Sequence, residues 1–276
     1  MKKHVYQPIR FFILTFVITW LFWLTAIILN SEDVSIMIMI IGMFAPTVGA
    51  LIMILPSKDS SLKKELKEKC FNFKKIKLLN LLIVMLLFLA AVGVSILLSV
   101  PFGQSLNQFA FTEDFSFTGI SILASVSILL SASVVEEIGW RGYGIDAIAQ
   151  KNTWFKATVI FGVIWATWHL PLFWIPGTYQ CGLRETNVWF MINFIVSIIP
   201  LAVIITWVYL RNNKNIFACA FIHMFINFVQ EKVAMTAETK CVETFVLVAV
   251  AIIIIIICEK KLFFGKEHIE KLTQAE

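Results

Sequence analysis

The chain has 276 residues, of which 59% are hydrophobic and only 15% are charged, and its formal net charge is +5. Soluble domains carry about 25% charged residues, so this composition excludes an ordinary soluble enzyme. A transmembrane helix needs about 20 apolar residues, so the length accommodates about eight spans joined by short loops. We therefore expect a single polytopic domain over residues 1–276, an all-α integral membrane protein built as a bundle of about eight helices.

Apolar runs bounded by polar residues predict where these spans lie. In chain order they cover residues 11–29, 36–55, 78–100, 119–137, 157–174, 188–210, 216–229 and 244–258.

Basic residues indicate the orientation of the bundle, because Lys and Arg are retained on the cytoplasmic side of a membrane. If the N-terminus is cytoplasmic, 20 of the 23 Lys and Arg residues fall on that side, including all eight in the loop 57–77. The opposite loops carry acidic pairs, among them Glu32 with Asp33 and Glu113 with Asp114. This pattern predicts a multi-pass protein of the cell membrane with both termini in the cytoplasm.

The loop 57–77 is also amphipathic, with Leu62, Leu66 and Phe71 placed among its lysines. A helix lying on an anionic leaflet has this composition. A solvated loop has it too, and we favour the loop.

The five cysteines show no paired spacing of the kind that binds metal. Cys181 and Cys241 both fall in predicted outer loops, the only compartment where a disulfide persists. We therefore hypothesise that these two cysteines pair. No sequence pattern indicates a nucleic acid partner, so the partners that we expect are the lipid bilayer and a substrate.

Three predicted spans contain polar residues, which lipid makes costly unless they are paired or face a cavity. Helical spacing puts Glu137 and Arg141 on one face and turns Glu136 about 100° away. Any one such residue is explained by packing, but the whole set predicts a functional site. Its members are Glu136, Glu137 and Arg141 at the end of the fourth span, Trp165 and His169 in the fifth, and His223 and Asn227 in the seventh.

This set is sufficient for peptide hydrolysis. A carboxylate and an imidazole that converge on a water supply a general base and its orienting partner. A second imidazole and an amide one helical turn apart can donate hydrogen bonds to the oxyanion that forms. Glutamate with two histidines can also bind catalytic zinc, which stays an alternative. We favour metal-free chemistry because Asn227 is a poor zinc ligand.

The order of these motifs resembles a known family. Glu-Glu-x-x-x-Arg, aromatic-x-x-x-His and His-x-x-x-Asn, all within residues 133–227, are similar to the signature motifs of the CAAX-processing and bacteriocin-processing (CPBP/Abi) intramembrane proteases, which include the type II CAAX prenyl endopeptidases. One departure is Trp165, where Phe is usual. A tryptophan keeps the aromatic wall of the pocket but enlarges it.

The resemblance implies a role for each motif residue. Glu136 and His169 would activate the hydrolytic water, and His223 and Asn227 would form the oxyanion hole. Glu137 and Arg141 would hold the architecture of the site. The activity implied is that of a glutamate-dependent endopeptidase with a polar cavity near the cytoplasmic side and no cofactor.

The substrate implied is a prenylated CAAX-type protein or another membrane-associated peptide, cleaved near its C-terminus. A bacteriocin-type peptide stays open as the substrate. A second class of function also stays open, that of a bacteriocin-immunity or proton-coupled transport protein in which the same groups form a proton path.

The predicted spans leave a problem of depth. In a straight helix from Ala157, His169 lies about 18 Å from the start, whereas Glu136 lies near the inner end of its own span. These two residues would not meet. We therefore expect an interfacial helix and a turn within residues 142–161, a fifth span that begins beyond Ala157, and Pro171 inside that span.

Overall fold

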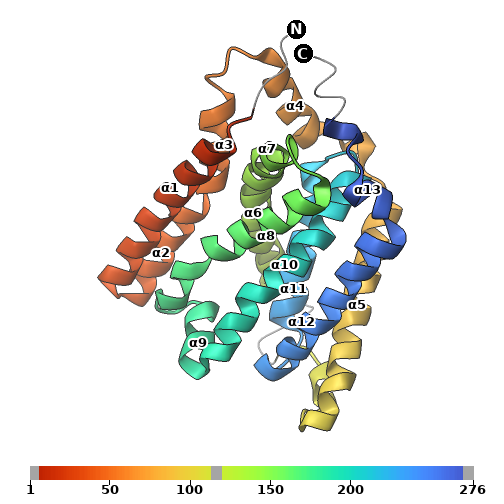
Figure 1. Cartoon of the computed structure of the whole chain (residues 1–276). Helices are drawn as coiled ribbons and strands as arrows, with labels where there is room; N and C mark the ends of the chain where they lie inside the picture. The colour runs from red at the N-terminus through yellow and green to blue at the C-terminus, as the bar shows by residue number, and fades with distance from the viewer. Residues whose placement is uncertain (1–5, 113–119, 270–276) are drawn as a thin grey trace.

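The computed structural model describes residues 6–112 and 120–269, and Figure 1 shows a bundle of helices. The acidic pair Glu113 and Asp114 therefore lies outside the described residues. Within them, one isolated bridge joins Phe111 to Val233, and the expected all-α class is confirmed. The α-helices are α1 (Pro8–Leu29), α2 (Glu32–Met43), α3 (Ala45–Ile54), α4 (Ser60–Phe71), α5 (Leu78–Ser99), α6 (Ile120–Gly139), α7 (Ile145–Ala149), α8 (Trp154–Trp168), α9 (Tyr179–Thr186), α10 (Val188–Arg211), α11 (Ile216–Lys232), α12 (Ala237–Ile252) and α13 (Lys260–Phe264).

Six segments of the described chain are long and apolar enough to cross a membrane, so the protein is a multi-pass membrane protein. The expected count of eight is not confirmed, because α6 and α11 are not among the six. α11 has only 17 residues and packs against α5, α6 and α10 inside the bundle. The six segments are Pro8–Leu29, Glu32–Ile54, Leu78–Phe102, Trp154–Trp174, Val188–Arg211 and Ala237–Cys258.

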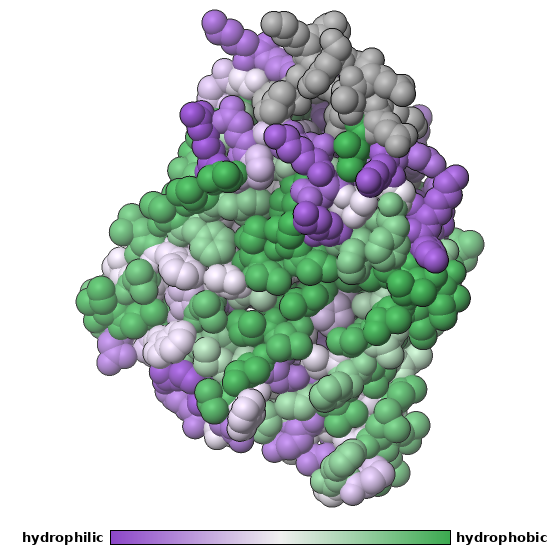
Figure 2. All heavy atoms as spheres, viewed as in Figure 1, coloured by the Kyte–Doolittle hydropathy of each residue, from purple (hydrophilic) through white to green (hydrophobic). Residues whose placement is uncertain are grey.

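Apolar side chains cover the middle of the molecule, and hydrophilic ones gather at the end that carries α4 (Figure 2). On α1, for example, Ile13, Leu21 and Ile28 are all exposed. A water-facing surface does not present so continuous an apolar belt, whereas a lipid-facing one requires it.

One end of the bundle, which we call the basic end, comprises residues 6–10, 57–77, 149–156, 211–215 and 259–269. Hydrogen bonds join these segments although they are distant in sequence. The Tyr6 amide donates to Gln150 Oε1 over 3.1 Å, the Lys77 amide donates to Asn212 Oδ1 over 2.8 Å, and His268 Nε2 donates to the Asn152 carbonyl over 3.0 Å. The first and last described residues therefore lie at the same end of the bundle.

Residues 60–71 form the helix α4, so the prediction of a loop is wrong and this part of the segment is helical. That the helix lies on an anionic leaflet stays a prediction. Asp59 caps the helix by accepting a hydrogen bond from the Ser61 amide. One face, carrying Leu62, Lys69 and Cys70, is buried against the bundle. The burial of this face explains why the segment is ordered as a helix.

A buried charge cluster attaches α4 to the bundle. Asp146 of α7 accepts hydrogen bonds from Lys69 Nζ and Lys214 Nζ, both over 2.6 Å, and from the Tyr209 hydroxyl over 2.5 Å. Burial opposes ionisation of Asp146, but the charges of Lys214 and Lys69 outweigh that effect and hold its pKa well below the usual value. The cluster joins α4, α7 and α10 at the basic end.

The extension of the fourth helix, α6, explains the depth of Glu136 in the bundle. This helix does not end near Glu137 but continues through a π-helical turn, η4 (Trp140–Gly144), into α7, which ends at Ala149. Glu136 therefore lies about 20 Å from Ala149 along the helix. Trp165 lies about 17 Å beyond Trp154, where α8 starts. The two residues reach the same depth.

The predicted turn within residues 142–161 is present between α7 and α8. The prediction that the fifth span begins beyond Ala157 is wrong, because α8 already begins at Trp154. Pro171 lies after α8, in the 3₁₀ turn η5 (Leu170–Trp174), and inside the apolar segment Trp154–Trp174, as predicted. The helix that differs from the prediction is therefore the fourth, α6, which continues farther through η4 and α7.

The packing of α3 fixes the position of α6 next to the site. The Thr47 hydroxyl of α3 donates a hydrogen bond to the Val135 carbonyl. One turn later Gly139 lies directly against the Pro46 backbone, where any β-carbon would overlap it. Glu136 lies between these two contacts.

The hypothesis of a disulfide is wrong, since all five cysteines are free. Cys181 on α9 instead donates a weak hydrogen bond from Sγ to Glu185 Oε1, over 3.4 Å.

Candidate active site

Glu136 is buried on α6 and is held through one of its two carboxylate oxygens. Oε2 accepts hydrogen bonds from Trp140 Nε1, over 3.3 Å, and from Trp165 Nε1, over 3.1 Å. Trp140 is one turn farther along the same helix, and Trp165 comes from α8. In the described part of the chain no hydrogen bond reaches Oε1, so this oxygen is available to accept a proton from a water.

Glu137 forms a different set of contacts. Its Oε1 atom lies 2.8 Å from Arg141 Nη1 and 3.0 Å from His223 Nδ1, and both acidic and basic partners of the i,i+4 pair are fully buried. The guanidinium of Arg141 also lies 4.8 Å from the centre of the Phe161 ring. The neighbouring carboxylates thus have separate partners, as the 100° between their side chains predicts.

The contact with Glu137 determines which ring nitrogen of His223 carries a proton. A carboxylate paired with Arg141 is ionised and can only accept hydrogen bonds. Nδ1 of His223 is therefore protonated and donates to Glu137.

His169 follows the last residue of α8. Its Nδ1 atom lies 2.7 Å from the Trp165 carbonyl oxygen. A carbonyl only accepts, so Nδ1 carries the proton and Nε2 is the acceptor of the neutral ring. The ring packs edge-on against Trp168 and Phe194.

Trp165 connects the motifs of three helices. Besides its hydrogen bond to Glu136, its ring centre lies 5.8 Å from that of His169 and 5.3 Å from that of His223. The structure thus places Glu136, His169 and His223 around one indole ring.

Asn227 lies one turn beyond His223 on α11 and is half-buried. The structure brings it near His223 through the helix itself. Among the described residues, no direct contact joins its side chain to Glu136 or to His169.

Sequence reasoning missed two hydrogen-bond donors of this site. Trp165 was expected only as an aromatic wall, and Trp140 was not singled out. The i,i+4 spacing of Trp140 from Glu136 was the available signal. For Trp165 the signal was the indole N–H, which the usual phenylalanine lacks.

We tested whether the site fits a metal ion. Within residues 6–112 and 120–269, no three His, Cys, Asp or Glu side chains are grouped so that they could hold one. Glu137, the carboxylate nearest His223, already binds Arg141. Metal-free chemistry stays a prediction.

Two comparisons with known proteins bear on the predicted resemblance. The family model described as type II CAAX prenyl endopeptidase Rce1-like matches residues 118–229, which include all the motif residues. The CAAX prenyl protease 2 of Methanococcus maripaludis is 39% identical over 269 residues, which are 96% of this chain and 98% of that protein. The resemblance is confirmed. The chain belongs to the family of Rce1-like type II CAAX prenyl endopeptidases.

Proposed function

We propose that the protein is an intramembrane endopeptidase that cleaves prenylated CAAX-type proteins near their C-terminus, by a water that Glu136 and His169 activate. The observation that carries this proposal is the geometry of Glu136. Two indole donors fix one carboxylate oxygen and leave the other free, inside a membrane protein whose family consists of such endopeptidases.

In the first step, water lies between Oε1 of Glu136 and Nε2 of His169. Glu136 takes a proton from the water as the water oxygen attacks the carbonyl carbon of the scissile peptide bond. The tetrahedral intermediate then collapses and the C–N bond breaks. Glu136 returns the proton to the leaving nitrogen, so the products are a new carboxylate and a free amine.

The oxyanion of the intermediate is stabilised by His223 and Asn227. Glu137 holds Nδ1 of His223, so Nε2 is on the side of the ring away from Glu137. As the oxyanion forms, a ring with a proton on Nε2 donates it to the oxyanion as a hydrogen bond. The Asn227 amide supplies the second donor. Donors fixed before the reaction stabilise developing charge more than water does.

The basic end faces the cytoplasm in this proposal, because Lys and Arg are retained there. Both termini are then cytoplasmic, in the cell membrane, and the polar cavity opens toward the same side. The prenyl chain of the substrate stays in the bilayer while the peptide enters the site.

A peptidase assay tests the proposal. We expect purified wild type to cleave a fluorogenic prenylated CAAX peptide, and Glu136→Ala and His169→Ala to lose this activity. Glu185→Ala and His268→Ala, which change the same residue types outside the site, should keep it. Equal turnover by the wild type and both site variants would refute the mechanism and favour a transport or immunity function.

A second arm tests the alternative of zinc. The metal-free mechanism predicts full activity after exhaustive chelation, with no stoichiometric metal by elemental analysis. Activity that chelation abolishes and zinc restores would establish the zinc-dependent version.

A further inference from the structure

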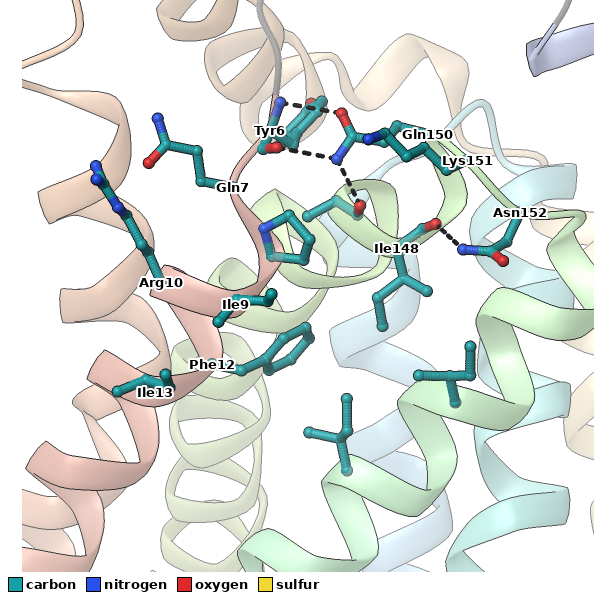
Figure 3. A pocket seen from close by; sticks show the side chains of 14 residues that line it. Tyr6, Gln7, Ile9, Arg10, Phe12, Ile13, Ile148, Gln150, Lys151 and Asn152 are labelled. Carbon is teal, nitrogen blue, oxygen red and sulfur yellow. Dashed lines mark hydrogen bonds between the residues drawn. The ribbon is translucent and has the colours of Figure 1, made fainter.

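A cavity of about 780 Å³ lies at the basic end, between the start of α1 and the corner that joins α7 to α8 (Figure 3). None of the proposed catalytic or supporting residues lines it. Its apolar wall combines residues of three helices, namely Ile9, Phe12, Ile13, Ile148, Ile160 and Ile164.

The lining of the cavity changes from polar to apolar along α1. Gln7 and Arg10 lie on the first turn of α1, and Lys151 and Asn152 lie opposite, in the turn after α7 (Figure 3). Ile13 lies farther along α1, toward the apolar belt. This arrangement matches an amphiphile with its head at the basic end and its chain in the belt.

Two cations, Arg10 and Lys151, line the polar end of the cavity. Among the described residues, no Asp or Glu lines the cavity, and neither Arg10 nor Lys151 forms an ion pair. Three other cations of the basic end are paired, since Lys69 and Lys214 bind Asp146, and Arg211 binds Glu259. Arg10 and Lys151 are therefore free to bind an anion.

We propose that this cavity binds an anionic membrane lipid, with its phosphate at the polar end that Arg10 and Lys151 flank from opposite sides and one hydrocarbon chain against Ile13, Ile160 and Ile164. Guanidinium and ammonium groups are the usual partners of phosphate. The volume is within the range of about 300–1,000 Å³ that ligand pockets occupy. A free phosphate ion would leave the apolar wall unfilled, so the bilayer is the source of the ligand.

The lipid would pack against the wall that positions Glu136. Phe12 lines the cavity and stacks on Trp140, with ring centres 6.4 Å apart and planes 22° apart. Trp140 in turn donates its hydrogen bond to Glu136. The site needs only that the protein lies in a membrane, and so it does not depend on the proposed peptidase activity.

The test measures lipid binding to the full-length, delipidated protein by native mass spectrometry, with phosphatidylglycerol and phosphatidylcholine of identical chains. We expect preferential binding of phosphatidylglycerol. The double variant Arg10→Gln/Lys151→Gln should lose about 25-fold in this preference, since each basic residue contributes roughly fivefold near anionic lipid. The matched control Lys63→Gln/Lys64→Gln removes two exposed charges of α4 at the same end and should bind as the wild type does.

Two further measurements separate the possible occupants. Ile13→Trp should weaken phosphatidylglycerol binding because the indole fills the apolar part of the cavity. Glycerol phosphate, which has no chain, should not compete with the lipid.

Four outcomes would overturn the proposal: equal binding of the two lipids, an equal loss in the α4 control, competition by glycerol phosphate, or competition by the prenylated peptide. The last would assign the cavity to the prenyl chain of the substrate. None of these outcomes depends on whether the protein cleaves the peptide.

Discussion

The indole nitrogen of Trp165 on α8 lies 3.1 Å from Oε2 of Glu136 on α6 and donates a hydrogen bond to it. The bond joins two helices that run in opposite directions through the bundle. It also fixes the orientation of the carboxylate, because the second donor, Trp140, binds the same oxygen.

The variant Trp165→Phe keeps an aromatic ring and removes this donor. We expect kcat to fall about tenfold or more with little change in KM, since a hydrogen bond to a charged group contributes about 1.5–3 kcal/mol. Steady-state kinetics on the prenylated peptide measure both constants. Trp174→Phe is the control because Trp174 lies in η5, is partly exposed and contacts Arg184 rather than the site. A kcat equal to that of the wild type would remove Trp165 from the positioning of Glu136.

The adjacent glutamates should differ in what they stabilise. Glu137→Gln leaves Arg141 as a buried charge without its counterion, and we expect it to destabilise the fold by about 3–5 kcal/mol. Glu136→Gln should abolish activity and leave the melting temperature close to that of the wild type, because Glu136 forms no ion pair with any described residue. Thermal unfolding in detergent, measured beside activity, tests this contrast. A stable Glu137→Gln protein would show that the ion pair does not maintain the architecture.

The proposed oxyanion hole predicts a specific kinetic effect. We expect Asn227→Ala to lower kcat by about 10²–10³ with KM nearly unchanged, as for the loss of one donor to a transition-state oxyanion. Asn193→Ala is the matched control, since the Asn193 amide donates to the Lys240 carbonyl away from the site. A change confined to KM would indicate that Asn227 binds the substrate in its ground state.

The charge cluster around Asp146 predicts a pH dependence of stability. Its pKa is lower in the folded than in the unfolded protein, so its contribution is complete above about pH 4, the usual range of Asp, and is lost as the pH falls below it. Asp146→Asn should therefore be less stable than the wild type at pH 7, and the difference should shrink below pH 4. Melting temperatures of the two proteins across this range measure the effect. A difference independent of pH would show that the cluster acts through packing alone.

Properties that lie within one helix could be predicted from the sequence. The pairing of Glu137 with Arg141, the divergence of Glu136 from Glu137, and the shared face of His223 and Asn227 all follow from 3.6 residues per turn. The hydropathy pattern likewise predicts the apolar segments. A segment that crosses lipid must form its backbone hydrogen bonds within its own helix and present apolar side chains. These local rules were enough to indicate the site, and the order of its motifs carried the resemblance to the family.

The tertiary structure alone decided where α6 ends. Arg141 and Asp146 looked like residues beyond the end of a span, since a charge in lipid is costly. Both remain inside the bundle because both are paired: Arg141 with Glu137 of the same helix, and Asp146 with Lys69 and Lys214 from other parts of the chain. The lysines lie far away in the sequence, on α4 and after α10, so no local pattern could show that the charge of Asp146 is neutralised. The depth of Glu136, and with it the meeting with Trp165, depends on those distant partners.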